Sequence, residues 1–190
     1  MRITGGVLGG RRLKVPPGNV RPTKDRVRES LFGILGDRIP GARVLDLFAG
    51  SGAMGLEAWS RGAATVYWVE NRSGVFRVLR ENVTSLCDDT ARPARCYCRD
   101  AFAFLRSAEV DMPFDIILAD PPYALYTEEP VLERLTCALG NGNLLSESGL
   151  VVLEHAGRYE LPELQGWRVM SDRRYGDTGI KILIQDCRGF

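Results

Sequence analysis

The sequence predicts an α/β domain with a doubly wound, mostly parallel sheet and a small N-terminal appendage. From residue 42 onwards, short β-branched apolar runs alternate with segments whose apolar residues recur at helical spacing. Such alternation is typical of parallel sheets with right-handed crossovers. The chain has 190 residues and is 45% hydrophobic, so it can bury a core of ordinary size for a globular domain.

The first twenty residues are expected to form a basic hairpin ahead of the main domain. Ile3–Leu8 and Arg12–Val15 read as two short strands around a glycine pair, and a Pro-Pro-Gly run then ends the unit. We therefore expect an extension over residues 1–20 and a main domain over residues 21–190.

Five helices and seven strands are expected after the hairpin. Thr23 suits a helix N-cap, and the tail lacks a helix between its last two strands, which predicts an antiparallel pair at a sheet edge. The expected helices are 23–36, Ala53–Ser60, a segment through Phe76–Leu86, Ala101–Leu105 and Glu128–Leu139. The expected strands are Arg43–Leu47, Thr65–Val69, Ala94–Cys98, Phe114–Ala119, Leu150–Glu154, Trp167–Arg173 and Gly179–Gln185.

The sequence Asp120-Pro121-Pro122-Tyr123 follows the apolar run Phe114–Ala119. Prolines cannot donate to a ladder, so they end the strand in a stiff turn. In open α/β sheets, ligands bind at the carboxyl ends of the strands. The Asp120 side chain and the Pro121 carbonyl form an acceptor pair that suits an exocyclic amino group, and Tyr123 offers a ring for a flat base to stack on.

A glycine-rich loop follows the first strand of the main domain. Gly50, Gly52 and Gly55 have the G-x-G-x-x-G spacing of a dinucleotide site, and Glu70 ends the next strand. Asp46, at the tip of the first strand, would repel a pyrophosphate. It suits instead a ligand with an ammonium and a sulfonium, which S-adenosylmethionine carries, with Glu70 on the ribose hydroxyls and Asp100 near the adenine amine.

On these motifs, together with Arg21-Pro22-Thr23 and Arg26–Phe32, the chain resembles the bacterial 16S ribosomal RNA guanine-N2 methyltransferase family of the RsmD type. The resemblance extends over nearly the whole chain. It implies a Rossmann-like, seven-stranded sheet with its last strand antiparallel, after an N-terminal hairpin. It also implies a cytoplasmic enzyme that methylates the exocyclic N2 of one guanine in the small ribosomal subunit, with S-adenosylmethionine as cofactor.

Three sets of site residues follow from the motifs and the resemblance. The catalytic residues are expected to be Asp120, Pro121, Pro122 and Tyr123. Those expected to bind the cofactor are Asp46, Phe48, Gly50, Gly52, Glu70, Asn71, Asp100 and Ala101. Those expected to bind RNA are Arg2, Arg11, Arg12, Lys14, Arg21, Lys24, Arg26 and Arg28.

The RNA-binding set rests on an uneven charge distribution. Residues 1–28 hold eight basic side chains and one acidic side chain, although the whole chain has a formal net charge of only +1. A basic arm on a mildly acidic body is what a protein that binds a polyanion would show. The five cysteines include no C-x-x-C pair, which argues for a reducing compartment and against a zinc site or disulfide framework. We expect a monomer that binds neither metal nor membrane and acts on 16S ribosomal RNA or on the assembled small subunit.

Three other interpretations remain open on the sequence alone. A DNA adenine-N6 or cytosine-N4 methyltransferase uses the same D-P-P-Y chemistry but generally needs additional length for its DNA target. An NAD-type oxidoreductase would share the glycine spacing but would have to tolerate Asp46 beside its phosphates. A non-catalytic RNA-binding module would keep the basic arm but would not need Asp120 beside two prolines.

Overall fold

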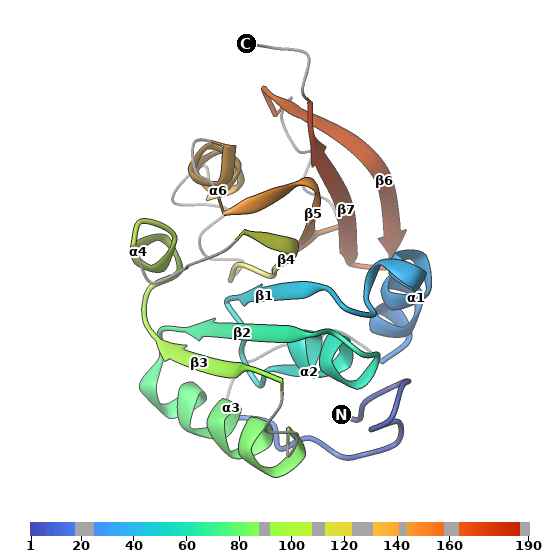
Figure 1. Ribbon diagram of the computed structural model, residues 1–190, viewed down its shortest axis with the longest axis vertical. Helices are drawn as coiled ribbons and strands as arrows, with labels where there is room; N and C mark the ends of the chain where they lie inside the picture. Colours follow the sequence, from blue (N-terminus) through green and yellow to red (C-terminus); the bar gives the residue numbers. More distant parts are fainter. Residues whose placement is uncertain are drawn as a thin grey trace. The chain divides into compact units, whose positions relative to one another are not determined.

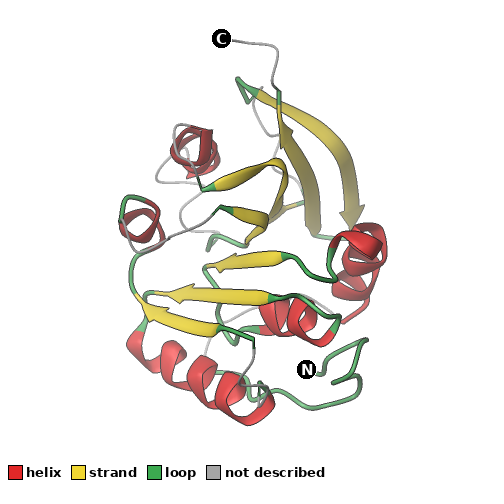
Figure 2. Cartoon of the chain, viewed as in Figure 1, coloured by secondary structure: helices red, strands yellow, loops and turns green. Residues whose placement is uncertain are grey.

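The computed structural model describes residues 1–17, 25–87, 92–107, 113–122, 131–140, 144–157 and 164–186. It divides into two compact units, Met1–Ala101 and Phe102–Phe190. The first holds strands β3-β2-β1 and the second holds β4-β5-β7-β6, which together are the seven strands of one mixed sheet (Figures 1 and 2). The predicted fold class is confirmed.

The first unit is a three-stranded parallel sheet with helices packed on it. Helix α2 contacts β1 and β2, α3 contacts β2 and β3, and α1 contacts α2. In chain order the elements are α1 (Asp25–Leu35), the 3-10 turn η1 (Gly36–Arg38), β1 (Arg43–Leu47), α2 (Ala53–Ser60), β2 (Thr65–Glu70), α3 (Ser73–Leu86) and β3 (Ala94–Cys98).

The burial of β1 and α2 shows how the strands and helices of the first unit pack together. Four of the five residues of β1 are buried, as a parallel strand covered on both faces requires. Helix α2 is apolar around most of its circumference and buries seven of its eight residues. It lies so close to β2 that a Cβ atom added at Gly55 would come within 2.2 Å of Trp68 Nε1. The glycine at this position is therefore required by helix–strand packing.

The N-terminal segment doubles back as predicted, but the two regular strands expected of the hairpin do not form. Within residues 1–17, the arms are joined by an isolated antiparallel bridge of Arg2 with Arg12 and by backbone hydrogen bonds from Ile3 N to Arg11 O at 3.0 Å and from Leu13 N to Met1 O at 3.1 Å. The glycine-rich segment instead turns onto the end of α2, where Val7 N and Leu8 N donate to Ser60 O and Oγ at 2.8 and 2.9 Å. A Cβ atom on Gly6 would lie 1.9 Å from Ser60 O, so this docking depends on glycine. The predicted domain boundary at residue 20 lies outside the described residues and stays a prediction.

The second unit begins with the last four residues of helix α4. Strand β5 pairs in parallel with β4 and antiparallel with β7, and β7 pairs antiparallel with β6. The last strand is thus antiparallel, as the resemblance implied. The elements are α4 (Ala101–Leu105), β4 (Phe114–Ala119), α6 (Val131–Gly140), β5 (Leu145–Ala156), β6 (Trp167–Tyr175) and β7 (Thr178–Gln185).

Most predicted elements have the observed bounds to within two residues. The largest difference within the described residues is β5, which begins at Leu145 rather than Leu150 and has a register irregularity against β4 between Phe114 and Ile116. The predicted helix start at Glu128 lies outside the described residues. None of the described helices is both long and apolar enough to cross a membrane.

Candidate functional site

The loop between β1 and α2 has an unusual backbone. Phe48, Gly50 and Gly52 have positive φ angles of 58°, 57° and 83°, a conformation that costs a residue with a side chain such as Phe48 some free energy. Ala49 N donates to Val69 O at 3.0 Å, and Gly52 N donates to Ala49 O at 2.7 Å. The loop therefore turns tightly and is fastened to the end of β2.

Asp46 lies under this loop and is almost completely buried, with 3% of its surface exposed. Its Oδ2 accepts a hydrogen bond of 2.8 Å from Gly55 N, in the first turn of α2. Burial raises the pKa of Asp46 from 3.8 to about 8, the Gly55 hydrogen bond opposes this, and the negative charge of Glu70 adds to it. Without a cation nearby, Asp46 is mostly protonated at neutral pH.

Glu70 ends β2 and is also buried, at 4% exposure. Its Oε2 accepts from Gly50 N at 3.0 Å, and its Oε1 accepts from Arg72 N at 2.9 Å and Arg72 Nε at 3.2 Å. Glu70 therefore connects the glycine loop to the start of α3. A carboxylate oxygen has two lone pairs, so Oε2 can still accept from a ligand hydroxyl.

The structure brings Asp46, Glu70 and the glycine loop together at the carboxyl ends of two paired strands. The parallel register sets Leu47 beside Val69. The carboxyl groups of Asp46 on β1 and Glu70 on β2 are therefore close to the same edge of the sheet. The other residues of the predicted cofactor set lie at the following turns: Asn71 and Asp100 are exposed, and Ala101 is buried at the start of α4.

The proline corner is in the second unit and has the predicted form. All residues of β4 except Asp115 are buried, and no regular element continues through Asp120, Pro121 and Pro122. Asp120 is half-buried, Pro121 is buried and Pro122 is exposed. Tyr123 lies outside the described residues.

The predicted RNA-binding residues separate into three groups. Arg2, Arg11, Arg12, Lys14 and Arg26 are exposed, as contacts to phosphate require. Arg21 and Lys24 lie outside the described residues. Arg28 is wrong as a surface contact, because it is 0% exposed and its charge is satisfied inside the first unit.

Glu57 is the partner that the sequence analysis missed. It is 0% exposed and accepts from Arg28 Nε at 3.2 Å, from Thr4 Oγ1 at 2.7 Å, and from Thr4 N and Gly5 N at 2.9 Å each. Arg61 also pairs with it at 2.9 Å. One signal was present in the sequence, since Glu57 is the single charged residue of the apolar helix Ala53–Ser60.

The hydrogen-bond network around Glu57 also includes the N-terminal segment and the start of α1. Arg28 donates to the carbonyl of Arg2 and to Asp25 Oδ1, the latter at 3.0 Å. The buried ion pair therefore holds the backbone from which Arg2, Arg11 and Arg12 project.

Within the described part of the chain, no group of three or more His, Cys, Asp or Glu side chains could hold a metal ion. The buried carboxyl groups near the glycine loop are instead bonded to backbone N–H groups. Their surroundings suit an organic cation that carries hydroxyl groups.

Comparisons with known proteins identify relatives of the whole chain. A family model described as Conserved hypothetical protein 95 matches residues 1–184. The chain is 37% identical to the Putative rRNA methyltransferase YlbH of Bacillus subtilis, over 96% of this chain and 97% of that protein. It is 35% identical to Ribosomal RNA small subunit methyltransferase D of Escherichia coli K12, over 100% of this chain and 92% of that protein.

A solved structure extends the likeness to three dimensions. The structure described as a putative methyltransferase, yhhF, from Escherichia coli superposes with a TM-score of 0.84 at 34% identity, and 99% of each chain is covered. The similarity thus includes both compact units.

Proposed function

The chain belongs to the Conserved hypothetical protein 95 family, the RsmD-type ribosomal RNA methyltransferases, and we propose that it methylates the exocyclic N2 of one guanine in 16S ribosomal RNA. S-adenosylmethionine is the methyl donor, and the substrate is naked RNA or the assembled small subunit. The enzyme then works in the cytoplasm as a monomer without a metal ion.

One observation carries the choice of cofactor. Asp46 and Glu70 are buried carboxyl groups at the ends of paired strands, and both are bonded to the N–H groups that a nucleotide phosphate would need. A pyrophosphate would meet carboxyl groups in place of free donors, so the geometry disfavours NAD. A sulfonium and an ammonium would stabilise the charged form of Asp46, and Glu70 Oε2 has a lone pair for a ribose hydroxyl.

The bound cofactor supplies an activated methyl group on a sulfonium, so the protein mainly contributes alignment and electrostatics. The guanine amine is a weak nucleophile because its lone pair is delocalised into the ring. Accepting its two hydrogens at the Asp120 carboxylate and the Pro121 carbonyl would draw that lone pair out of conjugation. The carboxylate also stabilises the positive charge that develops on the nitrogen.

The stiffness of the proline corner is part of this proposal. Two prolines fix the backbone after β4, so the carbonyl and the carboxyl group keep one orientation as the base enters. Tyr123 then stacks on a guanine that has left its neighbours in the RNA.

The proposed function is tested by methyl transfer from tritiated S-adenosylmethionine. We expect label in 16S ribosomal RNA or in small subunits from cells that lack this protein, and none in 23S ribosomal RNA or duplex DNA. Nuclease mapping should find the label in a single N2-methylguanine. Label in adenine-N6 or cytosine-N4 of duplex DNA would instead identify a DNA amino-methyltransferase.

A further inference from the structure

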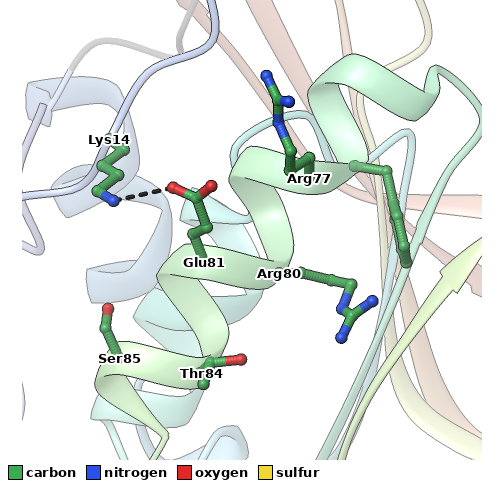
Figure 3. A pocket seen from close by; sticks show the side chains of 7 residues that line it. Lys14, Arg77, Arg80, Glu81, Thr84 and Ser85 are labelled. Carbon is green, nitrogen blue, oxygen red and sulfur yellow. Dashed lines mark hydrogen bonds and ion pairs between the residues drawn. The ribbon is translucent and has the colours of Figure 1, made fainter.

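A basic hollow lies on the surface of the first unit. It is formed between helix α3 and the end of the N-terminal segment and has a volume of about 480 Å³ (Figure 3). We call it the α3 hollow. Its lining residues are Lys14, Phe76, Arg77, Arg80, Glu81, Thr84 and Ser85.

Three cations and one carboxylate give the α3 hollow its charge. Lys14 Nζ pairs with Glu81 Oε2 at 2.8 Å, and this hydrogen bond lowers the pKa of Glu81. Arg77 and Arg80 are exposed and extend away from that pair (Figure 3). Within the described part of the chain, neither guanidinium makes a hydrogen bond or a salt bridge, so both are available to an anion.

The remaining lining residues suit a nucleotide. Thr84 is an exposed hydroxyl donor one turn after Arg80 along the helix. The Ser85 hydroxyl donates to Asn82 O at 3.0 Å and can accept from a ligand. Phe76 is half-buried and lines the hollow, so part of its side chain is open to a base. Guanidinium groups beside an aromatic ring are the combination with which proteins bind unpaired RNA, because bases stack and phosphates accept from arginine.

A buried amide fixes the α3 hollow relative to the cofactor loop. Asn82 Oδ1 accepts from Lys14 N at 2.9 Å, and Asn82 Nδ2 donates to Lys14 O and to Ser51 O at 2.9 Å each. Asn82 is 3% exposed, so these bonds are shielded from water. The Asn82 side chain therefore binds both the backbone of Lys14, which lines the hollow, and the backbone of Ser51 in the glycine loop.

We propose that the α3 hollow binds the backbone phosphate of an unpaired nucleotide of the ribosomal RNA substrate, with Arg77 and Arg80 as the phosphate contacts and Phe76 as the stacking surface. This rests on the proposed function and extends the RNA-binding surface from the N-terminal segment onto α3. Charge complementarity selects the occupant, since Glu81, the one carboxylate among the described residues that line the hollow, is already paired with Lys14.

The test compares the double variant Arg77→Gln/Arg80→Gln with the matched control Arg38→Gln/Arg168→Gln. The control removes two exposed arginines that do not line the α3 hollow. Binding to 16S ribosomal RNA transcribed in vitro is measured by filter retention over a series of salt concentrations, and calorimetry with S-adenosylmethionine checks that each variant is folded.

We expect the double variant to bind the RNA about tenfold more weakly than the control, with a salt dependence shallower by about 1 to 2 logarithmic units per decade. Cofactor affinity should equal that of the wild type. A third variant, Glu81→Gln, frees the Lys14 ammonium and should strengthen RNA binding.

The proposal is overturned if the double variant loses no more affinity than the control, or if Glu81→Gln weakens RNA binding. Saturable binding of inorganic phosphate, with unchanged RNA affinity in the double variant, would assign the hollow to a free anion and would also overturn it. Failure of the proposed function gives a different result, since the wild type would then bind RNA through the α3 hollow without methylating it.

Discussion

Asp46 makes the stability of the protein depend on pH. Its pKa is raised from 3.8 to about 8 in the folded chain, chiefly by burial. Between these two values the folded state holds a proton that the unfolded state has released. The free energy of unfolding therefore falls as pH rises from about 4 to about 8, with a slope from this group of up to about 1.4 kcal/mol per pH unit.

Asp46→Asn should remove this contribution and keep the shape of the site. The amide oxygen can still accept from Gly55 N, but the side chain does not titrate. Urea unfolding across this pH range should give a flatter curve for the variant than for the wild type. Parallel curves would show that Asp46 is charged in the folded protein without ligand.

The same residue links cofactor binding to a proton. A bound sulfonium and ammonium favour the charged carboxylate, so wild-type affinity for S-adenosylmethionine should rise with pH up to about 8. Calorimetry in two buffers of different ionisation enthalpy should detect the proton that is released. For Asp46→Asn we expect weaker binding and no proton release.

Asp120 is the residue on which the proposed chemistry depends. Asp120→Ala removes the acceptor that withdraws the amine hydrogens, so turnover should fall by about a hundredfold or more. Affinity for S-adenosylmethionine, measured by calorimetry, should stay near that of the wild type. Asp186→Asn, which removes an exposed carboxylate elsewhere in the second unit, serves as the control. Wild-type turnover of Asp120→Ala at saturating cofactor would exclude Asp120 from the reaction.

At the scale of elements, α2 is the helix that organises the first unit. Its N-terminal turn binds Asp46, its middle carries Glu57, and its end binds the N-terminal segment through Ser60. Glu57→Gln would remove the buried carboxylate partner of Arg28 and leave the partly exposed Asp25, at 3.0 Å, to pair with its charge. Breaking a buried ion pair in this way costs up to about 3–5 kcal/mol. Chemical denaturation should show this loss, and proteolysis should then cut the N-terminal segment faster.

The matched control for Glu57→Gln is Glu81→Gln on α3. Glu81 also pairs with a cation, but both partners are exposed, and such pairs contribute little to stability. We therefore expect no measurable change in the denaturation midpoint. If both variants lost the same free energy of unfolding, the Arg28–Glu57 pair would stabilise the fold no more than a surface ion pair does.

The elements show what a sequence pattern can predict. Strands β1, β3 and β4 and helix α2 have the predicted bounds because short apolar runs, glycines and prolines act locally. The strands predicted for the N-terminal hairpin do not form, because the chain near Gly6 bonds to Ser60, more than fifty residues away. Periodicity carries no information about a partner at that distance.

The candidate site follows the same division. The positions of Asp46 and Glu70 could be predicted because strand ends in a parallel sheet meet at one edge. Arg28 was assigned to RNA because a basic run gives no sign of which member turns inwards. Its partner, Glu57, is on α2, whereas Arg28 is on α1, and strand β1 lies between the two helices in the sequence. Only the folded chain therefore reveals the pair.

At the scale of the whole molecule, the exposed basic residues of the N-terminal segment and the buried carboxyl groups of Asp46 and Glu70 occupy different parts of the first unit. The basic side chains of the N-terminal segment stand on a backbone fixed by Glu57, whereas the buried carboxyl groups lie under the glycine loop. A polyanion and a cationic cofactor can therefore bind to different parts of the first unit without competing for the same charges.

This separation predicts opposite effects for buried and exposed arginines. Changing Arg2, Arg11 and Arg12 together to Gln removes three exposed charges, so affinity for 16S ribosomal RNA should fall and its salt dependence should become shallower by about 2 logarithmic units per decade. Stability and cofactor affinity should not change. Arg28→Gln should do the reverse and lower the denaturation midpoint, with no change in salt dependence for the fraction that stays folded. RNA binding by the triple variant with the wild-type salt dependence would show that the N-terminal segment braces the fold without contacting RNA.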